Sequence, residues 1–84
     1  MENKAELISS LDKLHTTALG AERIRRNLCI GTVDAVSWCK KRIAETGSVI
    51  SRKGKNLYID TGDCVITVNA RSYTIITAHK TKSR

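Results

Sequence analysis

The sequence lacks proline and phenylalanine, and its only aromatic residues are Trp38, Tyr58 and Tyr73. The core must therefore be built from Leu, Ile, Val and Ala, with Trp38 as its largest side chain. A chain of 84 residues forms one domain, near the lower limit for folding without disulfides or metals. Because such a core is thin, we expect a homodimer or a partner protein to supply further burial.

Cysteines and long apolar runs are also scarce. Cys29, Cys39 and Cys64 form an odd set without a C-x-x-C pair, which argues against a disulfide framework and against a zinc knuckle. Their apolar neighbours indicate free, buried thiols in a reducing compartment. The sequence has no apolar segment of 18 residues and no N-terminal apolar run of signal-peptide length. We therefore expect a cytoplasmic protein without a membrane partner.

Motifs for phosphate loops and metal chemistry are missing too. There is no Walker sequence and no G-x-G-x-x-G, and the acidic residues are scattered. The histidines stand at positions 15 and 79, which are 64 positions apart. The sequence therefore predicts no metal and no cofactor.

Acidic residues are few compared with basic ones. Lys and Arg number 15 against eight Asp and Glu, which gives a formal charge of +7 and a pI near 9.7. Residues 1–47 carry eight basic and six acidic side chains, a balance of +2, whereas residues 48–84 carry seven and two, a balance of +5. This excess indicates an anionic partner, either a nucleic acid or an acidic protein. The alternative is a solvated basic surface that only aids solubility.

Two apolar stripes predict helices in the first third of the chain. Residues 2–20 repeat apolar side chains at spacings of three and four, as an amphipathic helix does. This stripe consists of Leu7, Leu11, Leu14 and Ala18. Gly20 or the Thr16-Thr17 pair ends or bends it, and a second, short helix with Ile24 and Leu28 on one side follows up to Gly31. His15 falls near the end of the first helix, where we expect a surface role and no chemistry.

Residues 32–47 predict a third helix, which is the clearest local pattern. Thr32 is the expected N-cap, and Val36, Cys39 and Ile43 form the apolar stripe. Gly47 is the expected stop.

After Gly47 the apolar period changes from 3.6 to 2, which indicates strands. The β-rich runs are SVISR, NLYID, CVITVNA and SYTIITAH. Short turns separate them, so they predict a four-stranded antiparallel meander. The expected fold is α+β, with two or three N-terminal helices packed on one face of the sheet. The single domain then divides into helices over about residues 3–46, a sheet over about 48–80 and a basic tail at 81–84.

Alternation along the strands predicts which side chains face the helices. The expected covered positions are Leu57, Ile59, Ile66, Val68 and Ile76, the last flanked by Thr74 and Ala78. The expected open face holds Tyr58, Thr67, Asn69, Tyr73, Thr77 and His79. Ile75 fits poorly among these polar residues, so the reverse registration stays open as an alternative.

An open face of this composition suits RNA. Cations hold phosphates, tyrosine rings stack on unpaired bases, and amides or hydroxyls contact base edges. The residues predicted to bind nucleic acid are Arg23, Arg26, Arg52, Lys53, Lys55, Tyr58, Asn69 and Lys80. An ordinary solvated sheet, whose outer face is often rich in Thr and Tyr, is the alternative.

Two resemblances carry further expectations. The segments LGAERIRRNL, RKGKNLYI and ITVNARSYTIITAHK resemble a family of short bacterial proteins known only as a domain of unknown function. The order of helices before a meander that ends on TIITAH resembles the barnase–RelE–colicin group of small ribonuclease toxins. The second resemblance implies metal-independent cleavage of RNA.

That toxin resemblance implies a catalytic set on the last strand and the turn before it. His79 is the implied general acid or base, because an imidazole titrates near neutrality. Thr77 or Tyr73 would orient the phosphate, and Arg71 would stabilise the transition state. The expected sheet lacks the second histidine and the suitably placed Asp or Glu of a well-equipped ribonuclease, since Asp60 and Asp63 fall near a turn.

Two non-catalytic alternatives remain open. One is a module that binds nucleic acid or a nucleoprotein, such as a small regulator or an anti-defence protein. A helix-turn-helix version of it would use Arg23, Arg25 and Arg26 on DNA. The other is an adaptor whose basic sheet meets an acidic protein.

Overall fold

A computed structural model of the chain describes residues 11–31, 34–45 and 48–81. In chain order it contains the 3-10 helix η1 (Leu11–Lys13), the helices α2 (Ala18–Leu28) and α3 (Ala35–Ala44), and four strands. The strands are β1 (Val49–Lys53), β2 (Asn56–Asp60), β3 (Cys64–Asn69) and β4 (Ile75–Lys80). Both α-helices pack against the sheet, so the predicted α+β class is confirmed.

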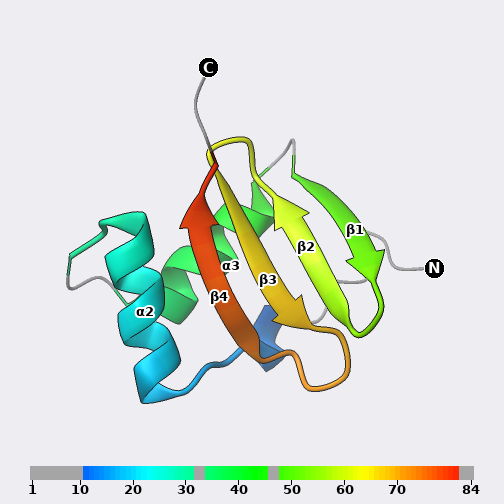
Figure 1. The fold of residues 1–84 in the computed structure, drawn as a ribbon, viewed down its shortest axis with the longest axis horizontal. Helices are drawn as coiled ribbons and strands as arrows, with labels where there is room; N and C mark the ends of the chain where they lie inside the picture. Colours follow the sequence, from blue (N-terminus) through cyan, green and yellow to red (C-terminus); the bar gives the residue numbers. More distant parts are fainter. Residues whose placement is uncertain (1–10, 32–33, 46–47, 82–84) are drawn as a thin grey trace.

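The sheet is the predicted antiparallel meander, with spatial order β1-β2-β3-β4. A two-residue turn joins Lys53 to its partner Asn56, and Gly54 has a φ of +64°, which suits the first position of a type II′ hairpin turn. α3 lies behind the sheet, and α2 lies alongside β4, the last strand in the order (Figure 1). Within the described residues, no helix covers the front of the sheet as drawn in Figure 1.

The first predicted helix is wrong over residues 11–17, while residues 2–10 lie outside the described part of the chain. Only Leu11–Lys13 forms a single 3-10 turn, and Leu14 is buried in the core. His15 pairs with the start of β4, because its carbonyl accepts a 2.7 Å hydrogen bond from Ile75 N. Tertiary pairing with a strand 60 positions away therefore outweighs the local helical pattern.

α2 begins at Ala18, because Thr17 caps it by accepting a 2.9 Å hydrogen bond from Gly20 N. Gly20 lies inside the helix, where a side chain would collide with Thr16 Oγ1. At the other end Cys29 takes the left-handed conformation, with a φ of 57°. The helix thus closes two residues before the predicted Gly31, in a conformation usually left to glycine.

α3 confirms the predicted third helix, with a different cap. Asp34 is the N-cap and accepts from Val36 N at 3.1 Å and from Ser37 Oγ at 3.2 Å. The expected cap, Thr32, lies outside the described residues. A carboxylate suits this position because it also faces the positive end of the helix dipole.

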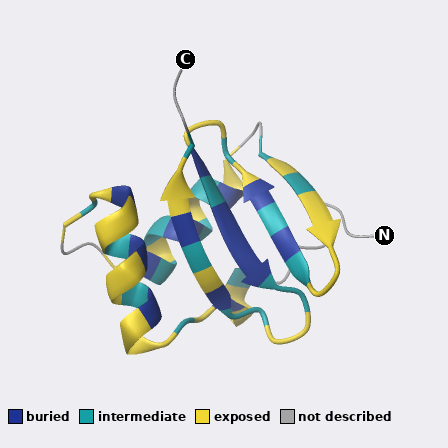
Figure 2. Ribbon diagram, in the orientation of Figure 1, coloured by how far each residue is buried: buried dark blue, intermediate teal, exposed yellow. Residues whose placement is uncertain are grey.

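The core lies between the sheet and the helices (Figure 2). Its largest fully buried side chains are Ile24, Ile43, Leu57, Ile59, Ile66, Val68 and Ile75. Trp38 is only half-buried at its margin, contrary to its expected place as the largest core side chain. The predicted covered positions Leu57, Ile59, Ile66, Val68 and Ala78 are confirmed.

The predicted burial of Ile76 is wrong, because the register of β3 and β4 shifts. Thr67 pairs with Thr77 but Val68 pairs with Ile75, so β4 carries Ile76 as one extra residue. An extra residue reverses the alternation on its own strand only. Ile75 is therefore buried and Ile76 is 39 % exposed, which removes the conflict that Ile75 posed on the open face.

Candidate functional site

The open face of the sheet carries a row of polar side chains across all four strands. Antiparallel pairing aligns Ser51 with Tyr58, Tyr58 with Thr67, and Thr67 with Thr77. Paired residues project on the same face, and their neighbours along each strand project on the other. We call these four residues, together with Asn27, the polar row. Tyr58, Thr67 and Thr77 occupy the face that was predicted for them.

Asn27 of α2 extends this row past the edge of the sheet. Its Nδ2 donates to Thr77 Oγ1 at 3.4 Å, across 50 positions of sequence. The contact follows from the packing of α2 along β4. Five elements therefore supply one line of hydroxyl, phenol and amide groups, in which Thr67 is buried and the other four residues are at least partly exposed.

Tyr58 is the one aromatic ring of the polar row. It lies on β2, an inner strand, and is half-buried between Ser51 and Thr67. The inner strand fixes its backbone on both sides, while part of the residue stays accessible. Such a ring can stack on a flat ligand without first losing much side-chain freedom.

Basic residues border the polar row at both ends. Lys53 lies two residues beyond Ser51 on β1 and so shares its face. Arg23 lies four residues before Asn27 on α2, which places both on one side of that helix. Both cations are exposed. Arg26 is exposed too, and its Nη2 lies 4.0 Å from Glu22 Oε2.

The two basic turns meet at one end of the sheet. Ala70 N donates to Lys55 O at 2.8 Å, which ties the β3–β4 turn to the β1–β2 hairpin. Lys55 and Arg71 are exposed at this end. Arg52 lies opposite Leu57, on the helix side, and its Nε donates to Gly54 O at 3.1 Å. Lys80 is exposed at the opposite end, where β4 finishes.

Two residues predicted for the open face have other surroundings. Tyr73 precedes β4 with a φ of 58°, packs against the core, and has Lys13 Nζ 5.9 Å from its ring centroid. Asn69 ends β3, and its Oδ1 accepts from Arg71 N and Ser72 N at 2.9 and 3.1 Å. This side chain shapes the turn, so it is not free to contact a base edge through Oδ1.

The four residues implied as catalytic are not gathered in one place. Thr77 and His79 share the open face of β4, with His79 exposed opposite Val65. Arg71 lies in the turn at the other end of the strand, beyond Asn69, which is itself four residues or roughly 13 Å from Val65, the partner of His79. Tyr73 lies beside Lys13, as described above.

Sequence reasoning missed three residues of this surface. The place of Ser51 on the open face follows from the register of the hairpin around Gly54, and alternation along β1 could have predicted it. Asp60 shares the row of His79, with Val65 between them. Asn27 needed the position of α2, which no local pattern reveals.

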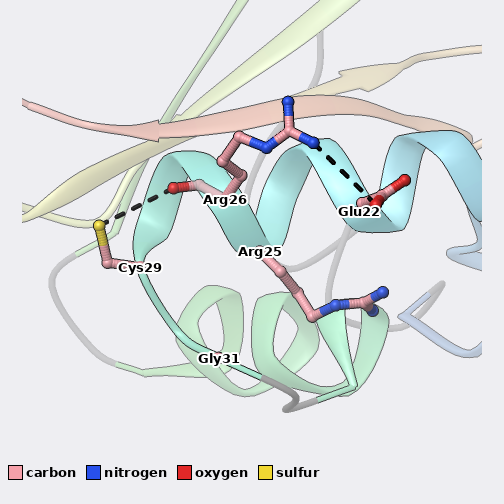
Figure 3. A pocket seen from close by; sticks show the side chains of 5 residues that line it. All are labelled: Glu22, Arg25, Arg26, Cys29 and Gly31. Atoms are coloured by element: carbon pink, nitrogen blue, oxygen red, sulfur yellow. Dashed lines mark hydrogen bonds and ion pairs between the residues drawn. The ribbon is translucent and has the colours of Figure 1, made fainter.

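A shallow hollow of about 380 Å³ lies at the C-terminal end of α2, lined by Glu22, Arg25, Arg26, Cys29 and Gly31. Arg25 and Arg26 leave the helix in opposite directions (Figure 3). Cys29 is exposed there, with Sγ 3.8 Å from Arg26 O.

The other two thiols belong to the core. Burial, reinforced by nearby Cys64, raises the pKa of Cys39 to about 12. Burial also raises the pKa of the Cys64 thiol. Neither offers a thiolate near neutral pH, so the covered side of the sheet carries no cysteine chemistry.

Neither a metal-binding cluster nor a membrane-spanning helix occurs within the described residues. These residues contain no group of three or more His, Cys, Asp or Glu side chains that could hold a metal ion. None of the helices described is long and apolar enough to cross a membrane.

Comparison with known proteins gives a family and nothing finer. No curated protein and no solved structure matches the chain. One family model matches residues 8–79, which is most of the 84 residues. The chain therefore belongs to the family described as "Protein of unknown function (DUF3781)".

Proposed function

We propose that the open face of the sheet binds single-stranded RNA, with Tyr58 stacking on an unpaired base. The observation that carries this proposal is the polar row, in which Ser51 and Tyr58 on one side of the buried Thr67, and Thr77 and Asn27 on the other, are accessible. Across the four strands alone it spans three strand spacings, roughly 14 Å. Other four-stranded sheets that bind RNA stack two or three bases over a comparable surface.

The chemistry of the row suits a nucleotide. Ser, Thr and Asn side chains both donate and accept hydrogen bonds, so they match base edges and the ribose 2′-hydroxyl. Lys53 and Arg23, at opposite ends of the row, supply positive charge for the phosphates on either side. The ring of Tyr58 lies between these two cations. A base would stack on this ring while the phosphates on either side of it contact Lys53 and Arg23.

Binding of labelled single-stranded RNA to wild type, Tyr58→Ala and Tyr58→Phe tests the proposal by fluorescence anisotropy. Tyr58→Ala should weaken binding by about 10- to 100-fold, the usual contribution of one stacked base. Tyr58→Phe keeps the ring and should stay within a few-fold of wild type. Equal affinities for all three proteins, with circular dichroism showing each one folded, would contradict the proposal.

Salt dependence adds a second readout. Each phosphate contact through a cation contributes about −0.7 to the slope of log K against log salt on a single strand. Lys53→Gln should reduce the slope by about that amount without changing base preference. Salt-insensitive binding to an acidic protein, with no affinity for RNA, would favour the adaptor alternative.

Cleavage of RNA, which the toxin resemblance implies, is the second candidate. His79 is exposed on the open face two residues from Thr77, so it is accessible to bound RNA. Arg71 and Tyr73 lie elsewhere, so the geometry supports binding better than catalysis. Wild type and His79→Ala should be incubated with total RNA, with and without chelator. Cleavage by wild type alone, unaffected by chelation, would establish the enzyme, whereas binding without cleavage supports the module.

A further inference from the structure

A chain of hydrogen-bonding side chains lies at the start of β4, away from the polar row. Ser72 Oγ is 2.8 Å from Thr74 Oγ1, and Thr74 Oγ1 is 2.9 Å from His15 Nε2. The other ring nitrogen, Nδ1, lies 2.9 Å from Lys13 O. We call His15, Ser72 and Thr74 the His15 cluster.

The backbone holds this cluster in place. Ile75 N donates to His15 O at 2.7 Å, and His15 N donates to Tyr73 O at 3.2 Å. Thr16 Oγ1 also donates to Ile75 O at 2.8 Å. The imidazole and the two hydroxyls are therefore positioned by segments 59 residues apart in sequence, although His15 and Ser72 are exposed to solvent.

The direction of each hydrogen bond follows from the carbonyl at one end. A carbonyl oxygen only accepts, so Nδ1 carries the hydrogen and, in the neutral ring, Nε2 must accept. Thr74 therefore donates to Nε2, and Ser72 donates to Thr74. In this state every hydroxyl hydrogen of the cluster is used internally, and none is available to a ligand.

Protonation of the ring reverses the chain. Nε2 then carries a hydrogen and donates to Thr74 Oγ1, so the Thr74 hydroxyl no longer donates to the ring. Protonation adds one hydrogen and one positive charge to the cluster. One hydroxyl hydrogen is then no longer used inside the cluster and can be donated to a ligand. Both changes favour an anion at the exposed side of the cluster.

The charges around the cluster point the same way. η1 supplies Lys13 and Asp12, and the β3–β4 turn supplies Arg71 directly before Ser72. The first turn of α2 carries no acidic residue. Two cations against one carboxylate, beside two hydroxyls and an imidazolium, match a doubly charged tetrahedral anion.

We propose that the His15 cluster binds a dianionic phosphate monoester or inorganic phosphate, and that this binding is coupled to protonation of His15. The proposal does not depend on RNA binding by the polar row. Phosphate free in solution and phosphate at the end of an oligonucleotide share the same chemistry, so separate probes distinguish the two sources.

Imidazole NMR provides the test, because the chain has only two histidines and His79 serves as an internal control. Sulfate is the first probe, since it stays dianionic between pH 5.5 and 7.5 and adds no titration of its own. We expect sulfate to shift the signals of His15 and not those of His79. Sulfate should bind about tenfold more tightly to the protein with the His15 ring protonated than to the protein with the ring neutral, the usual effect of a charge-assisted hydrogen bond. At high pH the neutral His15 ring should show the Nδ1–H tautomer.

Variants separate the cluster from general attraction to a basic surface. Thr74→Val and Ser72→Ala should each weaken sulfate binding and flatten its pH dependence, whereas His79→Ala and Tyr58→Ala should leave both unchanged. Thr74→Val is nearly isosteric and keeps the backbone bridge to His15, so weaker sulfate binding by this variant is not explained by loss of the fold. Equal shifts at both histidines, or an Nε2–H tautomer at His15, would overturn the proposal.

The source of the phosphate is resolved with two further ligands. Inorganic phosphate and a 5′-phosphorylated dinucleotide are titrated against the same signals, with the unphosphorylated dinucleotide as control. Tighter binding of the phosphorylated dinucleotide assigns the cluster to nucleic-acid ends, and equal binding assigns it to free phosphate. Failure of both to shift His15 would contradict the proposal while leaving RNA binding through Tyr58 untouched.

Discussion

The two faces of this sheet are built from alternate residues of the same strands, yet they differ in almost every property. On the helix side, Leu57, Ile59, Ile66 and Val68 are at most 1 % exposed. On the open side, Ser51, Tyr58 and Thr77 retain accessible polar groups, and basic residues border them. One face therefore stabilises the fold, while the other is free to meet a ligand. Substitutions on the two faces should separate stability from binding.

The largest expected effect concerns the thiols. Cys39 is buried with a pKa raised to about 12, so only about one molecule in 10⁴ carries its thiolate at pH 8. Cys29 is exposed. A thiol reagent applied to the native protein should modify Cys29 at least about a thousandfold faster than Cys39. Mass spectrometry of digested samples measures both rates, and unfolding in urea should make all three cysteines react alike. Simultaneous reaction in the native state would contradict this division.

The next effect compares neighbouring residues on opposite faces. Ile66→Ala removes a fully buried side chain and should lower the free energy of unfolding by about 2–5 kcal/mol. Thr77→Ala acts on the open face and should cost about 1 kcal/mol or less. Urea titration of both variants measures the difference. A loss at Thr77 as large as that at Ile66 would mean that the open face also belongs to the core.

The smallest effect is at the edge of the molecule. Hydrogen bonding to Arg42, and to Thr61, lowers the pKa of the Asp63 carboxyl below its usual range. A carboxyl whose pKa is lowered in the folded protein stabilises the fold at pH values above its unfolded-state pKa of ~3.9. This stabilisation is lost as the pH falls through the folded-state pKa. Because Asp63 is 63 % exposed, solvent screening keeps the contribution to about 0.5 kcal/mol. Asp63→Asn should therefore destabilise slightly at pH 7 and not at pH 2–3, as measured by urea midpoints. An equal loss at both pH values would assign the effect to packing.

Much of the fold was predictable because its signals are local. Period-2 alternation after Gly47 predicted four strands in a meander, and the polar positions Tyr58, Thr67 and Thr77 followed from it. Helical spacing predicted α3 and most of α2. These patterns depend on neighbours within a few residues, where sequence and backbone geometry are directly linked.

The failures share a different cause. Residues 11–17 carry a helical stripe, but Leu14 enters the core and His15 pairs with β4. Tyr73 takes a positive φ in a turn that Asn69 stabilises, so the expected strand starts late. In each case a contact with a distant segment outweighs the local preference, since the Tyr73 carbonyl also accepts from His15 N.

The sequence by itself determined the class of the fold, the strand order and the basic character of the chain, because each of these follows from composition or local periodicity. Only the tertiary structure decided that Ile76 is an extra residue in β4, that Asn27 extends the polar row, and that His15 meets Thr74. Register and docking depend on which segments pair, and pairing is a property of two distant stretches together that neither stretch specifies alone.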